Sequence, residues 1–71
     1  MRNTIKSKAD KATRETALAT LDRAISVIGL GTVADRLVTH PVTIERLSKR
    51  QREVSDFLAR QILRVLSEYR L

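Results

Sequence analysis

The chain has 71 residues and a formal net charge of +6, with 14 Lys and Arg against 8 Asp and Glu, one histidine and no cysteine. This length allows one small domain, and the lack of cysteine excludes a disulfide scaffold, a thiol nucleophile and cysteine metal ligands. The longest apolar run, residues 27–30, is far shorter than the roughly 20 residues of a membrane span. We therefore expect a cytoplasmic module with no metal site, no cofactor, no small-molecule substrate and no membrane partner.

Positive charge is concentrated in two places. Residues 1–12 are predicted to form a basic arm, in which Arg2, Lys6 and Lys8 are candidate phosphate contacts. A second cluster lies between Arg46 and Arg52. Two basic clusters on so small a chain favour an anionic polymer as partner, although basic segments that only aid solubility are the alternative that charge alone leaves open.

The apolar spacing predicts helices and no strands. Apolar residues at positions 18, 21, 25 and 28 indicate a first amphipathic helix. Thr13 is its expected N-cap, with Ser7 as an earlier alternative, and Gly29 is its expected end. Thr32, followed three residues later by Asp35, resembles a capping box and is expected to open a short second helix.

Two further helices are predicted after residue 40. Proline disfavours helical geometry in the residue before it and suits a first helical position, so the third helix is expected to start at Pro41 with His40 as a solvent-facing turn residue. A fourth helix is expected to begin near Arg52 and run to the end. The predicted fold is a small all-α, four-helix domain over residues 13–71 with an extended C-terminal helix.

The segment between positions 33 and 47 has the pattern of a helix-turn-helix. Ala34 is the small residue that lets a second helix cross closely, and Leu37, Ile44 and Leu47 are the apolar contacts around the turn. The pattern departs at Val38, where glycine is common. Two ordinary amphipathic helices of a bundle are the alternative explanation of this spacing.

A family resemblance supports the helix-turn-helix interpretation. The segment ISVIGLGTVADRLVTHPVTIERLSKR, residues 25–50, resembles the helix-turn-helix region of the lambda CII-type phage transcription regulators, and ALATLDRAI upstream is similar to their first helix. The shared features are Ile25, Gly29, Ala34, Asp35, Ile44, Arg46 and the basic pair Lys49-Arg50. The sequence departs from the family at Val38 and at Leu47, where the family has tryptophan. The resemblance implies a small phage or prophage regulator that binds DNA as an oligomer, but its differing C-terminal part does not carry over the family's tetramer or promoter activation.

Helical geometry assigns roles within the third helix. With Ile44 and Leu47 inward, the opposite face carries the candidate base contacts, and the later positions suit phosphate contacts. The base-contact candidates are Val42, Thr43, Glu45 and Arg46, and the phosphate candidates are Lys49, Arg50, Arg52 and, at the second helix, Thr32. For Glu45, an ion pair with Lys49 four residues later is favoured over a base contact.

The last helix has an apolar surface that covers half of its circumference or more, which is wider than one domain core needs. The surplus predicts a homodimer or tetramer whose interface contains Leu58, Ile62, Leu63, Leu66 and Tyr69. A first helix that folds back over this surface is the competing explanation. Symmetric association would also give a helix-turn-helix two half-sites.

Taken together, these patterns predict a sequence-specific regulator of transcription that binds double-stranded DNA, with repression favoured over activation for so short a chain. A small interaction module or inhibitor whose basic face binds an acidic protein is the alternative from another class. An RNA-binding role is disfavoured because aromatic stacking residues are few. No constellation of nucleophile, histidine and acid indicates an enzyme.

Overall fold

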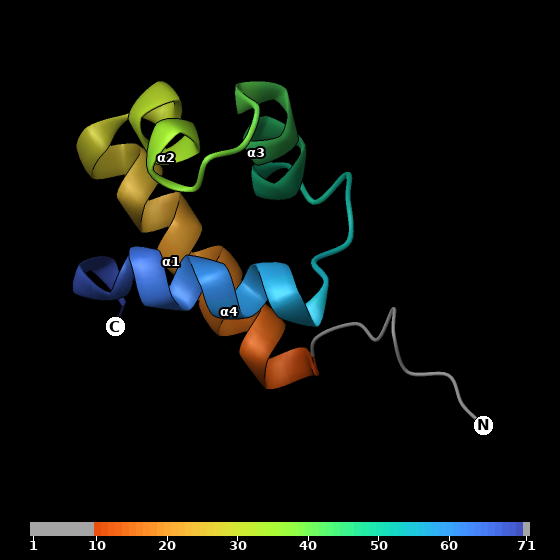
Figure 1. Cartoon of the computed structure of the whole chain (residues 1–71). Coiled ribbons are helices and arrows are strands. Elements are labelled where there is room, and N and C mark those ends of the chain that lie inside the picture. The colour runs from red at the N-terminus through yellow and green to blue at the C-terminus, as the bar shows by residue number, and fades with distance from the viewer. Residues whose placement is uncertain (1–9, 71) are drawn as a thin grey trace.

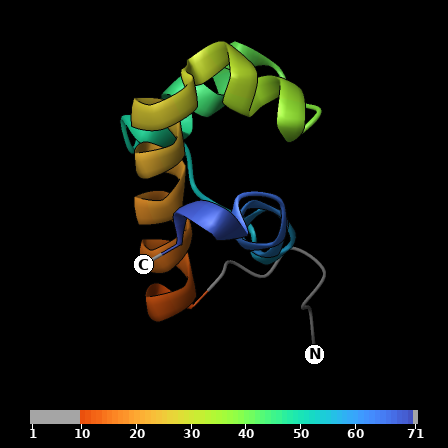
Figure 2. The ribbon, with the colours of Figure 1, turned by 90° about the vertical axis from the view of Figure 1, so that its left-hand side faces the viewer.

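The computed structural model describes residues 10–70, and the regular elements in this range are helical. They are α1 (Lys11–Ile28), α2 (Leu30–Arg36), α3 (Pro41–Ser48), α4 (Asp56–Val65) and a final 3-10 turn, η1 (Ser67–Tyr69). In Figure 1, α4 crosses α1, while α2 and α3 lie together near the C-terminal end of α1. Figure 2 looks along α4 and shows α1 upright beside it. The prediction of a small all-α domain with four helices is confirmed.

The first helix begins earlier than the sequence predicted. Asp10, rather than Thr13, is the N-cap, because its Oδ1 accepts a hydrogen bond from the Thr13 amide at 3.0 Å. Aspartate ranks above threonine as an N-cap, which is consistent with this choice. Lys11 and Ala12, which we assigned to the basic arm, therefore belong to the first turn of α1. Arg2, Lys6 and Lys8 lie outside the described residues.

Gly29 ends α1 and begins α2. Its amide donates to the Ile25 carbonyl at 2.9 Å, and its own carbonyl accepts from the Val33 amide at 3.1 Å. Its φ of 90° is one that side-chain-bearing residues rarely adopt, so glycine is needed here. The end of α1 is as predicted, but the expected capping box is wrong: Thr32 lies inside α2, and the N-cap is Gly29 without a side-chain hydrogen bond.

The connection between α2 and α3 is a left-handed turn without glycine. The Thr39 amide donates to the Ala34 carbonyl at 2.9 Å and the Val38 amide to the Asp35 carbonyl at 3.1 Å. This pair of bonds is the Schellman arrangement, which places the residue after the C-cap in the left-handed region. That residue is Val38, with φ of 54°, and its side chain is 88% exposed. A β-branched residue therefore occupies the conformation that glycine adopts without strain.

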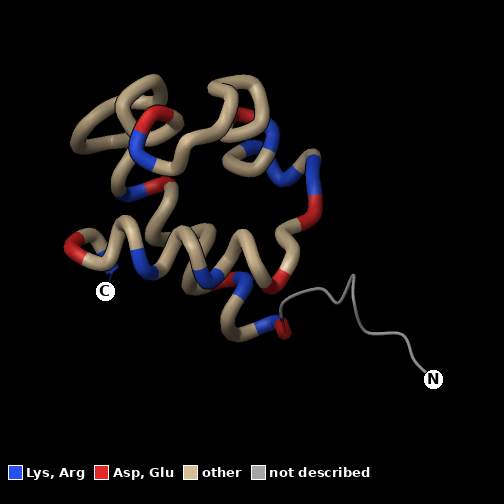
Figure 3. Tube along the Cα trace, in the orientation of Figure 1, with Lys and Arg blue, Asp and Glu red and all other residues tan. Residues whose placement is uncertain are grey.

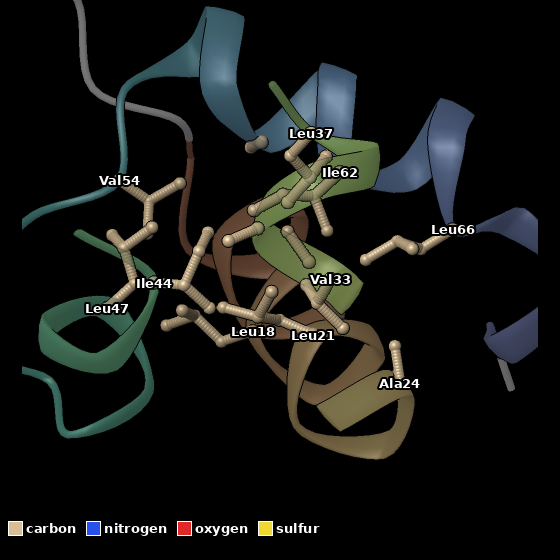
Figure 4. Packing of buried hydrophobic residues seen from close by; sticks show 13 residues of the cluster. Leu18, Leu21, Ala24, Val33, Leu37, Ile44, Leu47, Val54, Ile62 and Leu66 are labelled. Atoms are coloured by element: carbon tan, nitrogen blue, oxygen red, sulfur yellow. The ribbon is translucent and has the colours of Figure 1, made fainter. Parts of the chain in front are cut away.

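All four helices and the loop after α3 contribute to one hydrophobic core, part of which Figure 4 shows. The core consists of Ala17, Leu18, Leu21, Ala24, Val33, Ala34, Leu37, Ile44, Leu47, Val54, Ala59, Ile62 and Leu66. Ile44 and Leu47 are fully buried, as predicted for the inward face of the third helix. The small Ala34 is also buried, which agrees with the close approach of α2 and α3.

The expected long last helix is wrong. Residues 49–55 form a loop, α4 begins only at Asp56, and it ends at Val65 before η1. The start is fixed by Ser55, whose Oγ accepts from the Leu58 amide at 3.1 Å. Val54, just before this cap, is 1% exposed and anchors the loop in the core. The apolar pattern continues through this loop, so the pattern alone did not reveal the break.

Candidate nucleic-acid interface

The start of α3 is fixed by two adjacent residues. Pro41 occupies the first helical turn, where its missing amide proton costs no hydrogen bond. His40 is the N-cap, and its Nδ1 accepts from the Val42 amide at 3.2 Å. His40 is exposed, as predicted, and its ring supplies the side-chain cap of α3.

The outward face of α3 brings together most of the predicted base-contact residues. Because Ile44 and Leu47 point into the core, Val42, Glu45 and Arg46 are exposed on the other side, and Val42 retains 43% of its accessible surface. Thr43 is half-buried and lies at the edge of this face. The structure therefore presents an apolar group, an acid and a guanidinium side by side on one short helix.

Within residues 10–70, the charges on this face differ in how far they are already paired. The Lys49 Nζ lies 3.1 Å from Glu45 Oε2, which confirms the predicted ion pair along the helix. Both side chains are half-exposed, so this pair contributes only a few tenths of a kcal/mol. The Arg46 guanidinium makes no hydrogen bond or ion pair with any described residue, and it is therefore available to a ligand.

Arg50 is engaged in holding the end of α3. It adopts φ of 62° after the C-cap, with its amide bonded to the Leu47 carbonyl at 3.1 Å, and its Nη1 donates to the Ser48 carbonyl at 2.7 Å. Its Nη2 lies 3.0 Å from Asp22 Oδ2 on α1. The other Asp22 oxygen accepts from the Ser48 hydroxyl at 3.1 Å. We call Asp22, Ser48 and Arg50 the α1–α3 clamp, a structural role that the sequence analysis missed because 28 residues separate Asp22 from Arg50.

The remaining phosphate candidates are scattered. Arg52 is exposed in the loop after α3 and, among residues 10–70, has no ion-pair partner. Thr32 is exposed on α2, but as a residue inside the helix it does not supply the predicted helix-capping hydroxyl. In Figure 3, blue Lys and Arg segments follow one another along the end of α3 and the loop beyond it.

The predicted oligomer interface is corrected by burial within the single chain. Ile62 and Leu66 are fully buried, so they are core residues and are not available to a partner. The apolar surface of α4 packs across α1, and Leu37 at the end of α2 belongs to the same core. The Gln61 Nε2 on α4 also donates to the Leu37 carbonyl, 3.3 Å away. The other three predicted interface residues, Leu58, Leu63 and Tyr69, are half-buried at the edge of the core.

Phe57 is the large exposed apolar side chain of α4. It retains 76% of its accessible surface, and it is not among the predicted interface residues. At 100° per residue it lies opposite Ala59 and Ile62, on the same side as Arg60 and Arg64. Arg60 and Arg64, at the helical spacing of three and seven residues from Phe57, are the sequence signal that could have placed it on the exposed side.

One residue near the edge of the domain has a shifted pKa with a clear cause. Partial burial raises the pKa of Tyr69, and the neighbouring Glu68 carboxylate raises it further. The Tyr69 hydroxyl is therefore neutral at physiological pH. It does not indicate an acid–base site.

Comparison of the chain with protein-family models, with curated proteins and with solved structures gives no match. Over residues 10–70, no helix is both long and apolar enough to cross a bilayer. In the same part of the chain, no three His, Asp or Glu side chains are grouped as metal ligands would be.

Proposed function

We propose that the chain is a sequence-specific DNA-binding regulator of transcription that inserts α3 into the major groove. The observation that carries this proposal is the exposed face of α3, on which Arg46 lies beside Val42 and away from the buried Ile44 and Leu47, with no ion-pair partner among residues 10–70. An α-helix fits the major groove, which is about 12 Å wide. Arginine suits bidentate contact with guanine, and an apolar side chain such as Val42 suits contact with a thymine methyl group.

The contacts that hold α3 at both ends are consistent with this role. Residues 37–40 join it to α2 in a short turn, and the α1–α3 clamp holds its other end. Lys49 and Arg52 extend the positive charge beyond the base-contact positions, where phosphates would lie. We infer repression rather than activation as the regulatory role, because so small a chain offers little surface for contacts with polymerase beyond DNA binding.

The proposal is tested by selecting bound duplexes from a random library and then measuring affinity for the selected sequence. Arg46→Ala should weaken specific binding by about 1–3 kcal/mol, or roughly 5- to 150-fold, and relax preference at one base position. Arg23→Ala removes an exposed arginine from α1 and is the matched control. Equal affinities for the two folded variants would contradict the proposed recognition face. If the wild-type protein enriches no duplex but binds an acidic protein, the interaction-module alternative would be favoured.

We further propose that the protein binds DNA as a homodimer, because two copies supply two half-sites. With Ile62 and Leu66 buried in the chain's own core, the candidate contact is Phe57, extended by the half-buried Leu58. Phe57→Glu should shift sedimentation at micromolar concentration towards monomer and weaken DNA binding, without a change in thermal stability. The dimer would be refuted if the wild-type protein is a monomer in sedimentation experiments, both free in solution and bound to DNA.

A further inference from the structure

A hollow lies between the N-terminal part of α1 and the loop that follows α3. It is lined by Arg14, Leu18, Arg50, Gln51, Arg52, Glu53 and Val54. Three of these residues are arginines, contributed by two segments that are far apart in the sequence. The loop residues that line the hollow follow Lys49 directly in the chain, at the C-terminal end of α3.

The backbone around this hollow is fixed from two sides. Val54 is 1% exposed and Leu18 is 7% exposed, so both are core residues that hold the two walls of the hollow in place. Arg50 ties the start of the loop to α1 through the clamp with Asp22. A loop anchored at both ends presents its remaining side chains at defined positions, which a binding site needs.

The charge around the rim is largely unpaired. Within residues 10–70, the side chains of Arg14 and Arg52 make no hydrogen bond or ion pair, whereas Arg50 is engaged with Asp22. Glu53, which is the acidic residue among those that line the hollow, already interacts with another group. Within residues 10–70, neither guanidinium group is held in an ion pair, although the Asp10 carboxylate acts electrostatically on Arg14 from four residues earlier in the chain.

We propose that this hollow binds a backbone phosphate of the DNA strand that passes the C-terminal end of α3, with Arg14 and Arg52 as its ligands. The inference rests on the proposed DNA-binding function and adds Arg14 on α1 to the contacts. Guanidinium groups match phosphate oxygens in geometry and charge.

The test uses the full chain and the selected duplex, with affinity measured by fluorescence anisotropy over a series of salt concentrations. Arg14→Gln and Arg52→Gln should each reduce the slope of log affinity against log salt by about 0.9, which is about 5-fold in affinity at 0.15 M salt. The double variant should lose roughly 30-fold, while Arg14→Lys should keep the slope. Arg23→Gln is the matched control, because nine residues along α1 place Arg23 on the opposite side of the helix from Arg14.

The outcomes separate this inference from the proposed function. If the double variant matches Arg23→Gln while Arg46→Ala still loses specific binding, the phosphate site is wrong and DNA recognition by α3 stands. A wild-type protein that binds no duplex overturns both. Titration of pyrophosphate, followed by the Nε–H signals of Arg14 and Arg52 in NMR spectra, tests a free phosphate compound as the ligand. Shifts in those signals, together with unchanged duplex binding by the double variant, would overturn the DNA assignment in favour of a small phosphate ligand.

Discussion

Replacing Val38 by glycine should stabilise the protein. Val38 has φ of 54° in the turn between α2 and α3, and a left-handed conformation costs a side-chain-bearing residue about 1–2 kcal/mol. Glycine removes this cost but loses about 0.5–1 kcal/mol more conformational entropy on folding. Since the valine side chain is 88% exposed, its deletion sacrifices only a few tenths of a kcal/mol of burial.

The upper part of the strain range applies to a β-branched side chain, so the expected net gain is about 0.5–1 kcal/mol. For a domain of this size, that gain corresponds to an increase in melting temperature of roughly 2–8 °C. Urea unfolding followed by circular dichroism at 222 nm should show a higher midpoint with an unchanged slope.

Val27→Gly is the matched control for this prediction. Val27 is also exposed, at 63%, but it lies within α1, where glycine lowers helix stability. The two variants therefore lose the same atoms and should change the free energy of unfolding in opposite directions. If Val38→Gly were as destabilising as Val27→Gly, the left-handed turn would not be the source of strain that we infer.

Three further predictions concern the clamp, the core and the first helix cap. Asp22→Ala should lower the free energy of unfolding by about 1 kcal/mol, because the half-exposed ion pair with Arg50 is lost. In urea unfolding, the difference between Asp22→Ala and the wild type should be smaller at high salt than at low salt, because salt screens the ion pair. Leu66→Ala should cost about 2–5 kcal/mol, enough to leave the protein largely unfolded at 37 °C by circular dichroism, since this side chain is fully enclosed. The Thr13 side chain and amide lower the pKa of Asp10 below its ordinary value of 3.8. The cap should therefore stabilise the fold fully above pH 3.8, and this stabilisation should be lost as the pH falls through the lowered pKa. The pH dependence of the Thr13 amide signal in NMR spectra would show this loss. A Thr13 signal that does not respond to acid would contradict the cap.

The sequence predicted those features that depend on local patterns. The end of α1 at Gly29, the start of α3 at Pro41, and the inward faces of Ile44 and Leu47 follow from spacing and backbone preference alone. The i,i+4 pair of Glu45 with Lys49 was predictable for the same reason. These features need only residues within a few positions of one another.

Features that depend on distant segments were missed or misplaced. The α1–α3 clamp joins Asp22 to residues that no local pattern connects to it. The burial of Ile62 and Leu66 follows from how α1 and the end of α2 cover α4, and a helical projection of α4 does not contain that information. The loop over residues 49–55 was hidden because Val54 continues the apolar spacing of α4 while it belongs to the loop.

The two left-handed residues, Val38 and Arg50, lie on either side of α3 and have a joint consequence for its motion. Glycine at these points would act as a hinge, because it exchanges among many backbone conformations at little cost. A valine and an arginine have far fewer alternatives, so the short helix between them is preorganised relative to the rest of the domain. Less motion would then be frozen when α3 meets the DNA that we propose it binds, which saves binding entropy. Valine at position 38 thus costs the fold stability through its strain and narrows the backbone freedom at the start of α3.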